Sequence, residues 1–152
     1  MLKEIITWSR KKSPWVCHLS SGGSCNGCEI EILACLAPII DVDRFGILLK
    51  GSPRHSDILL VTGILTKRAC KEFLTVYNQT PDPKAVVAIG ACACSGGCFQ
   101  GSYNRAPGGL KQNIPIAAFV PGCPPKPEAI VQGVVTALKK FKWKKWKSLK
   151  KP

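Results

Sequence analysis

The residues of this chain that are best suited to chemistry are its cysteines, which number nine in 152 residues. Cys25 and Cys28 form a C-x2-C pair in the glycine-rich run SSGGSCNGC. Cys92 lies in the run GACACSGG, and Cys123 lies between prolines in PGCPP. Thiolates bind zinc and iron–sulfur clusters, and a C-x2-C pair alone does not separate these sites from a thioredoxin-like redox site. A thioredoxin-like site would leave the two other cysteine loops unexplained.

A disulfide framework is the weaker interpretation of these cysteines. Their number is odd, and the basic cluster at the N-terminus follows the apolar stretch, which is the reverse of a secretory signal. We therefore expect a cytoplasmic protein, in which disulfides are rare. Metal or cluster ligation is favoured, and Cys17, Cys35 and Cys70, which fall within predicted strands or helices, are expected to be buried structural thiols.

The composition is that of one folded domain. Hydrophobic residues make up 45% of the chain and charged residues 20%, and no apolar run approaches the roughly 20 residues of a membrane-spanning helix. The formal net charge is +13, but the last fourteen residues hold eight Lys and no acid, which leaves +5 for the other 138. We expect a basic N-terminal segment (1–14), a single domain (15–140) and a Lys/Trp-rich tail (141–152).

The tail carries Trp143 and Trp146 among its lysines. Basic and aromatic residues suit a membrane surface or a partner protein, and they also suit nucleic acid. A third interpretation is a solvated helix end that places favourable charge at a helix C-terminus. Docking at a partner or at the membrane surface ranks first, and no nucleic-acid partner is expected.

Short β-rich runs alternate with helical patterns through the middle of the chain, which is typical of a parallel sheet covered by helices. Residues 100–113 look like an irregular loop, and no internal repeat is found. The expected strands are Trp15–Ser20, Arg44–Leu49, Asp57–Thr62, Ala85–Ile89 and Ile116–Val120, and the expected helices are Glu29–Leu36, Thr66–Tyr77 and one from Pro127 through Leu138.

The order of these elements brings the cysteine loops together. All strands of an open parallel sheet point their carboxyl ends to one edge, and ligands bind at that edge. The segments with Cys25 and Cys28, with Cys92 and with Cys123 each follow a predicted strand. We therefore expect these four thiols, from three loops spread over about 100 residues, to meet at one rim of the sheet.

Four stretches resemble the small cluster-binding subunit that energy-converting, membrane-bound nickel–iron hydrogenases share with respiratory complex I. They are SCNGCEIEIL at 24–33, GSPRHSDILLVTG at 51–63, GACACSGG at 90–97 and VPGCPPKPEAI at 120–130. The resemblance implies a flavodoxin-like fold, with helices on both faces of the sheet and the cluster at the carboxyl edge. It also implies one four-iron four-sulfur (4Fe-4S) cluster held by Cys25, Cys28, Cys92 and Cys123. Cys92 fits the family spacing better than its neighbours Cys94 and Cys98.

One difference separates the branches of that family. Complex I subunits carry two adjacent cysteines where this chain has Cys25-Asn-Gly-Cys28, so the C-x-G-C-E form resembles the hydrogenase branch. The resemblance implies an electron-transfer subunit of a multisubunit nickel–iron hydrogenase, with no complete active site on this chain. The implied partners are a nickel–iron large subunit, a ferredoxin-like iron–sulfur subunit and membrane-embedded ion-translocating subunits, with this chain on the cytoplasmic side. The same subunit in a sulfur-reducing or quinone-reducing relative is the alternative.

Two further groups have open roles. Glu29 directly follows Cys28 and is expected either to tune the cluster or carry protons, or simply to support the start of a helix. Arg54 and His55 either contact the large subunit or form an ordinary polar loop.

A third class of function is a zinc-stabilised nucleic-acid-binding protein. It predicts tetrahedral zinc, no visible absorption and no redox response. The iron content of the purified protein separates it from both redox hypotheses.

Overall fold

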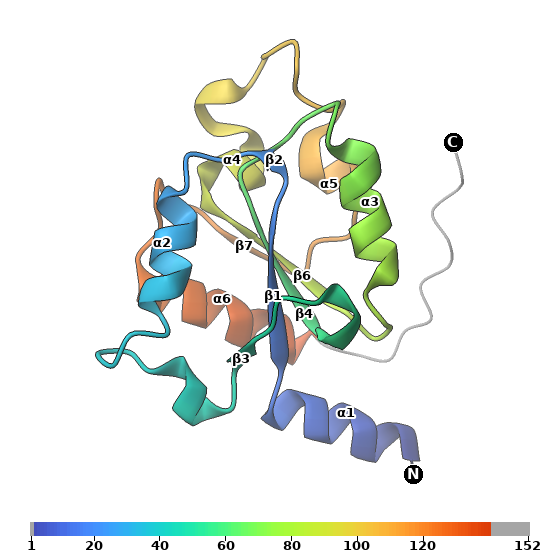
Figure 1. The fold of residues 1–152 in the computed structure, drawn as a ribbon, viewed down its shortest axis with the longest axis vertical. Helices are drawn as coiled ribbons and strands as arrows, with labels where there is room; N and C mark the ends of the chain where they lie inside the picture. The colour runs from blue at the N-terminus through green and yellow to red at the C-terminus, as the bar shows by residue number, and fades with distance from the viewer. Residues whose placement is uncertain (1, 141–152) are drawn as a thin grey trace.

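A computed structural model describes residues 2–140 of the chain. Its centre is a five-stranded parallel sheet (Figure 1). Numbered by their order in the chain, the five strands lie side by side in the order 2-1-3-4-5. This is the flavodoxin-like order, and it confirms the expected fold. The strands, in spatial order, are β3 (Leu48–Leu49), β1 (Trp15–Ser20), β4 (Ile58–Thr62), β6 (Ala85–Ile89) and β7 (Ala118–Val120).

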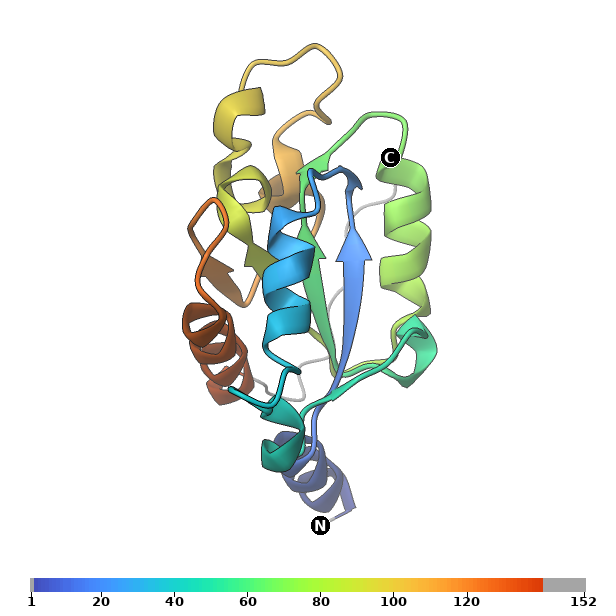
Figure 2. The same ribbon diagram turned by 60° about the vertical axis from the view of Figure 1, so that its left-hand side comes forward.

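Helices cover both faces of this sheet (Figure 2). On one face lie α2 (Gly27–Ala34) and α6 (Pro127–Lys139), and on the other lie α3 (Cys70–Gln79) and α5 (Gly109–Asn113). The remaining elements are α1 (Leu2–Lys12), α4 (Gly90–Ser95), the 3-10 helices η1 (Val42–Phe45), η2 (Pro53–His55) and η3 (Gly97–Phe99), and an antiparallel pair, β2 (Gly22–Gly23) with β5 (Ile64–Leu65).

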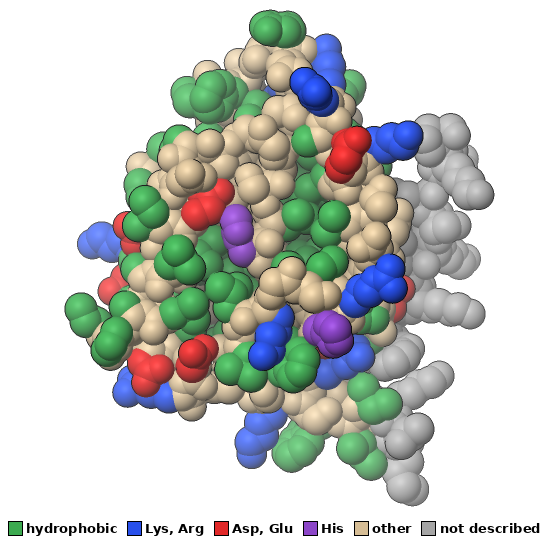
Figure 3. Space-filling view, in the orientation of Figure 1, with side chains coloured by type: hydrophobic (Ala, Val, Ile, Leu, Met, Phe, Trp, Pro, Cys, Tyr) green, Lys and Arg blue, Asp and Glu red, His purple; other side chains and the backbone are tan. Residues whose placement is uncertain are grey.

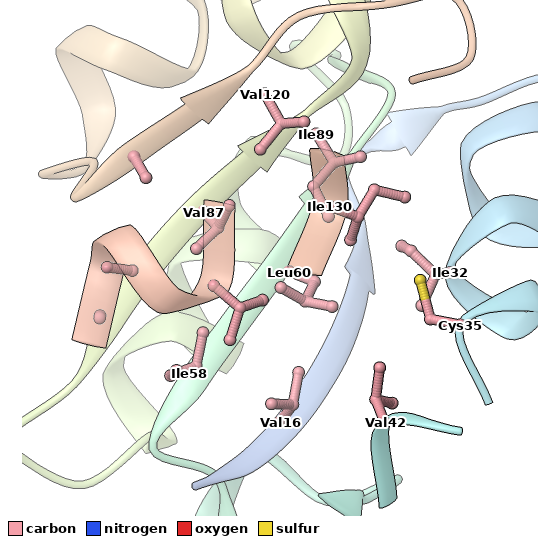
Figure 4. Packing of buried hydrophobic residues seen from close by; sticks show 14 residues of the cluster. Val16, Ile32, Cys35, Val42, Ile58, Leu60, Val87, Ile89, Val120 and Ile130 are labelled. Atoms are coloured by element: carbon pink, nitrogen blue, oxygen red, sulfur yellow. The ribbon is translucent and has the colours of Figure 1, made fainter. Parts of the chain in front are cut away.

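The core consists of two clusters, one on each face of the sheet. In β4, Ile58 and Leu60 point toward α6 and α2, whereas Leu59 and Val61 point toward α3 and α5. Figure 4 shows the first cluster, in which side chains of the sheet, α2 and α6 interdigitate. Burying a large aliphatic side chain contributes about 1.5–3 kcal/mol, so the continuous apolar runs of β4 and β6 hold the scaffold together.

Helix α6 packs unusually close to the sheet. A side chain at Gly133 would place its Cβ 2.3 Å from a methyl carbon of Val120, in β7. Only glycine permits this approach. The contact fixes the end of β7, and therefore the start of the segment that carries Cys123.

Three expected elements differ from the structure. The strand expected at Arg44–Leu49 is present but shorter, because Val42–Phe45 forms the 3-10 helix η1 and the sheet pairs only Leu48 and Leu49. Gly46, with φ of 81°, turns the chain between them. The helix expected from Thr66 begins at Cys70 instead, after a turn in which the Thr66 hydroxyl accepts a hydrogen bond from the Ala69 N–H at 3.2 Å.

The strand expected from Ile116 pairs with its neighbour only over Ala118–Val120. Parts of two expected loops are helical, namely α4 in the run GACACSGG and α5 within 100–113. The basic N-terminal segment also contains a helix, α1. Among residues 2–140 no helix combines the length and the apolar character that crossing a membrane requires. The Lys/Trp-rich tail, 141–152, lies outside the described residues.

Candidate functional site

The three cysteine-bearing segments follow three parallel strands at the carboxyl edge of the sheet (Figure 2). Cys25 and Cys28 come after β1, with Cys28 in the first turn of α2. Cys92 lies in α4, directly after β6, and Cys123 lies three residues after the end of β7. The three segments therefore lie at one edge of the sheet, as the sequence predicted.

Close contacts join these segments to one another. A Cβ at Gly90 would lie 2.5 Å from the Sγ of Cys28, so only glycine lets the Cys92 segment approach the C-x2-C pair. The Ala91 N–H donates a 2.7 Å hydrogen bond to the carbonyl of Gly122, which ties the Cys92 segment to the Cys123 segment.

Burial and neighbouring charges disfavour the ionised form of the Cys28 and Cys92 thiols. Burial raises the pKa of the Cys28 thiol to about 11, and the charges of Glu29, Cys25, Cys92 and Cys123 add to the increase. Burial also raises the pKa of Cys92, with contributions from Cys98, Cys123 and Cys25. Cys25 and Cys123 are exposed, whereas Cys28 and Cys92 are half-buried, so the group opens toward the surface.

The other cysteines have different surroundings. Cys17 and Cys35 are buried in the two cores, as expected of structural thiols, and Cys70 packs partly against the second core. The Sγ of Cys94 points back toward the carbonyl of Ala88, at 3.6 Å. Cys98 differs from these because it is exposed and lies close to Cys92.

The donor set fits an iron–sulfur cluster. Soft thiolates on glycine-rich loops favour zinc or iron–sulfur clusters over hard cations such as Mg²⁺. Within residues 2–140 no three His, Cys, Asp or Glu side chains are grouped to hold a single metal ion. A four-iron cluster binds each thiolate at a different iron, so its ligands surround a bulky core and do not converge on one point. The exposure of Cys25 and Cys123 leaves the group of thiols open on the side where such a core would bind.

A chain of polar side chains leads inward from Cys28. The Thr62 hydroxyl donates a hydrogen bond of 2.7 Å to Oε1 of Glu29, and the Nε2 of His18 lies 2.9 Å from the same hydroxyl. Since the single hydroxyl proton goes to Glu29, the Thr62 oxygen accepts and His18 Nε2 donates. The other carboxylate oxygen, Oε2 of Glu29, is buried and has no hydrogen-bond partner in the described chain.

Burial and hydrogen bonding oppose each other at Glu29. Burial raises its pKa, but hydrogen bonds from Ser24 and Thr62 outweigh that effect, with help from the backbone and the His18 charge, so the pKa is lowered overall. Burial lowers the pKa of His18, and the charge of Glu29 only partly offsets this. At neutral pH the pair is therefore an ionised carboxylate and a neutral imidazole, 3.7 Å apart, rather than an ion pair.

Sequence reasoning missed His18 and Thr62. Both belong to parallel strands that pair in register, and Thr62 ends an apolar strand at the carboxyl edge, which is the one pattern that could have drawn attention to it. Arg54 and His55 lie elsewhere. They are exposed in η2, which precedes β4 and so lies toward the opposite edge of the sheet from the thiols, with His55 6.4 Å from the Trp15 ring.

Residues 25–137 match the model of one protein family, the 20 kDa subunit of NADH–ubiquinone oxidoreductase. The chain is 58% identical over 131 residues to a probable membrane-bound hydrogenase subunit, mbhJ, of Pyrococcus furiosus, covering 86% of this chain and 77% of that protein. It is 42% identical over 134 residues to a subunit of the NADH-quinone oxidoreductase of Citrifermentans bemidjiense, covering 88% of this chain and 75% of that protein.

A solved structure of an archaeal respiratory membrane complex, the membrane-bound sulfane sulfur reductase, contains a similar chain. The TM-score is 0.76 at 35% identity, over 90% of this chain and 75% of that one.

Fold and comparisons agree on the class, a flavodoxin-like α/β subunit of oxidoreductases. The chain belongs to the family of the 20 kDa subunit of NADH–ubiquinone oxidoreductase. The named relatives are subunits of oxidoreductases, which agrees with the family resemblance of the four sequence motifs.

Proposed function

We propose that this chain binds one 4Fe-4S cluster through Cys25, Cys28, Cys92 and Cys123, and that it transfers electrons as a subunit of a membrane-bound hydrogenase. The observation that carries the proposal is geometric: the three segments that bear these thiols meet at one edge of the sheet, where only a glycine at position 90 fits against the Sγ of Cys28 and the Ala91 N–H is hydrogen-bonded to the carbonyl of Gly122. When bound, the cluster would supply one-electron transfer.

The residues around the thiols have separate tasks in this proposal. The glycine at position 90 leaves room for the Sγ of Cys28, and the hydrogen bond from Ala91 to Gly122 holds two of the ligand-bearing segments at a fixed spacing. Glu29, held by Thr62, keeps a carboxylate next to Cys28. A fixed negative charge at this position would disfavour added electrons and lower the reduction potential.

An exposed apolar surface supports a role as a subunit. Large hydrophobic side chains gather over α2 and the segment that follows it, on the left of Figure 3. Exposed patches of this kind mark protein–protein contacts. The residues are Ile30, Leu33, Ile39 and Phe45, which are 64%, 58%, 95% and 60% exposed.

The complex would contain a nickel–iron large subunit beside the thiol site, a ferredoxin-like iron–sulfur subunit and membrane-embedded ion-translocating subunits. This chain would lie at the cytoplasmic side of the membrane. The identity of 58% to a membrane-bound hydrogenase subunit supports this assignment. The tail, with Trp143 and Trp146, would dock at the membrane surface or a partner.

A sulfur-reducing complex is the second candidate, because a chain of the membrane-bound sulfane sulfur reductase has the same fold at 35% identity. A quinone-reducing complex is favoured less, because Cys25 and Cys28 are separated by two residues.

The two candidates are separated by purifying the native complex without oxygen. We expect nickel in the preparation and hydrogen evolution from reduced ferredoxin. A preparation that lacks nickel and reduces sulfane sulfur, but evolves no hydrogen, would reject the hydrogenase assignment while keeping the electron-transfer assignment.

A further inference from the structure

The side chain of Arg105 lies where a side chain at either of two neighbouring glycines would collide with it. Its guanidinium lies against two glycines, such that a Cβ at Gly96 would be 3.0 Å from its Cζ and a Cβ at Gly109 would be 2.7 Å from one terminal nitrogen. Both glycines have positive φ, 99° and 60°, a conformation that favours glycine. The backbone of Arg105 is itself anchored by a β-bridge to Thr66. The two loops are therefore built around this one side chain.

One nitrogen of the Arg105 guanidinium lacks a hydrogen-bond partner in the described chain. The Nε of Arg105 is buried and has no hydrogen-bond partner within residues 2–140. Leaving such a donor unsatisfied is costly. An anionic group close to the partly buried guanidinium of Arg105 would offset this cost.

The thiol site is a neighbouring place for that anion. Gly97 follows Gly96 directly, and a Cβ at Gly97 would lie 3.3 Å from the Sγ of Cys92. Arg105 and Cys25 also line the same hollow at the surface of the molecule. Arg105 therefore lies beside two different ligand-bearing segments.

We propose that Arg105 is a positioning residue that supplies a compensating positive charge to the thiolate-bound cluster and so raises its reduction potential. This inference rests on the proposed function. Four thiolates make the bound group anionic in both redox states, and reduction adds one further negative charge. A nearby guanidinium therefore stabilises the reduced state more than the oxidised state.

The test is a redox titration of the full-length chain, reconstituted with iron and sulfide and followed by EPR with dithionite as reductant. Arg105→Gln removes the charge, and Arg105→Lys retains it. Arg44→Gln is the matched control, since Arg44 is exposed in η1, toward the opposite edge of the sheet.

At the midpoint potential of the unmodified protein, we expect the ratio of reduced to oxidised cluster to fall about tenfold in Arg105→Gln, as for a unit charge at roughly 10 Å with an effective dielectric constant of about 20. Tenfold corresponds to about 59 mV for one electron. Arg105→Lys and Arg44→Gln should stay within about twofold of the unmodified ratio. A ratio in Arg105→Gln within twofold of the unmodified one, or an equal fall in Arg44→Gln, would overturn the proposal.

Iron content separates this inference from the proposed function. An unmodified chain that binds no iron contradicts the function itself. If Arg105→Gln alone fails to hold iron, Arg105→Lys decides. A lysine variant with the full iron content supports compensation by charge. A lysine variant that also loses iron shows that the shape of the guanidinium matters instead, and overturns the proposal.

Discussion

Thr62 and Glu29 are joined by a hydrogen bond of 2.7 Å, in which the hydroxyl donates to the carboxylate. The bond connects the carboxyl end of β4 to the first turn of α2, next to Cys28. Thr62 is fully buried, so the bond is protected from water. The placement of the C-x2-C pair therefore depends on a strand that is distant from it in sequence.

Replacing Thr62 by valine tests this connection. Thr62→Val leaves Oε1 of Glu29 and Nε2 of His18 without their shared partner, and an unsatisfied buried polar group costs about 1–3 kcal/mol. We expect the free energy of unfolding in urea to fall by that amount. Thr62→Ser keeps the hydroxyl and should lose less. Equal stability of the valine variant and the unmodified chain would show that the bond contributes nothing.

The stability of the protein should depend on the ionisation of His18. Burial lowers the pKa of His18 below 6.5, so between the folded pKa and 6.5 the unfolded chain binds more protons than the folded chain. Stability is therefore fully present above pH 6.5 and decreases as the pH falls through this window. We expect the urea concentration at the unfolding midpoint to decrease as the pH is lowered from about 7.5 to about 5.5. In His18→Gln this decrease should be smaller.

The exposed histidine, His55, provides the control for this measurement. His55→Gln should leave the slope unchanged. If the pH dependence persisted in His18→Gln and disappeared in His55→Gln, it would come from His55, and the prediction for His18 would be wrong.

The absence of a side chain at Gly90 is expected to be essential for the site. Gly90→Ala would place a methyl group 2.5 Å from the Sγ of Cys28, at a residue with φ of 87°. The positive φ alone costs roughly 1–2 kcal/mol for a residue with a side chain. We expect the variant to be less stable and to retain less iron after reconstitution. Gly51→Ala is the matched control, because a Cβ there meets no atom within 4 Å. Full iron retention by Gly90→Ala would mean that the thiols are arranged differently.

The central strands could be predicted from the sequence because their residues are buried on both faces. Ile58–Thr62 and Ala85–Ile89 are continuous apolar runs bounded by turn residues, and the structure confirms them to within one residue. The edge strand was predicted too long for the opposite reason. Leu48 and Leu49 are only half-buried. The 3-10 helix before them is bounded by Asp41 and Gly46, which both have positive φ, and the pattern of apolar residues does not predict these turns.

Proximity of the cysteine segments could be predicted because it follows from topology alone. The polar chain from His18 to Glu29 could not, because it depends on strand register and on side-chain directions. His18 and Thr62 are 44 residues apart in sequence and meet only when β1 and β4 pair. Arg105 was missed because it lies in a segment that looked irregular and its side chain is positioned by Gly96 and Gly109, which come from two different loops.

The central claim is that four thiols from three segments hold one iron–sulfur cluster, and the most direct test is iron and sulfide analysis combined with EPR after anaerobic purification. We predict four irons and four sulfides per chain, with a signal on reduction, in the unmodified protein and in Cys70→Ala, and loss of the intact cluster in Cys123→Ala. Zinc without iron, or an intact cluster in Cys123→Ala, would contradict the account.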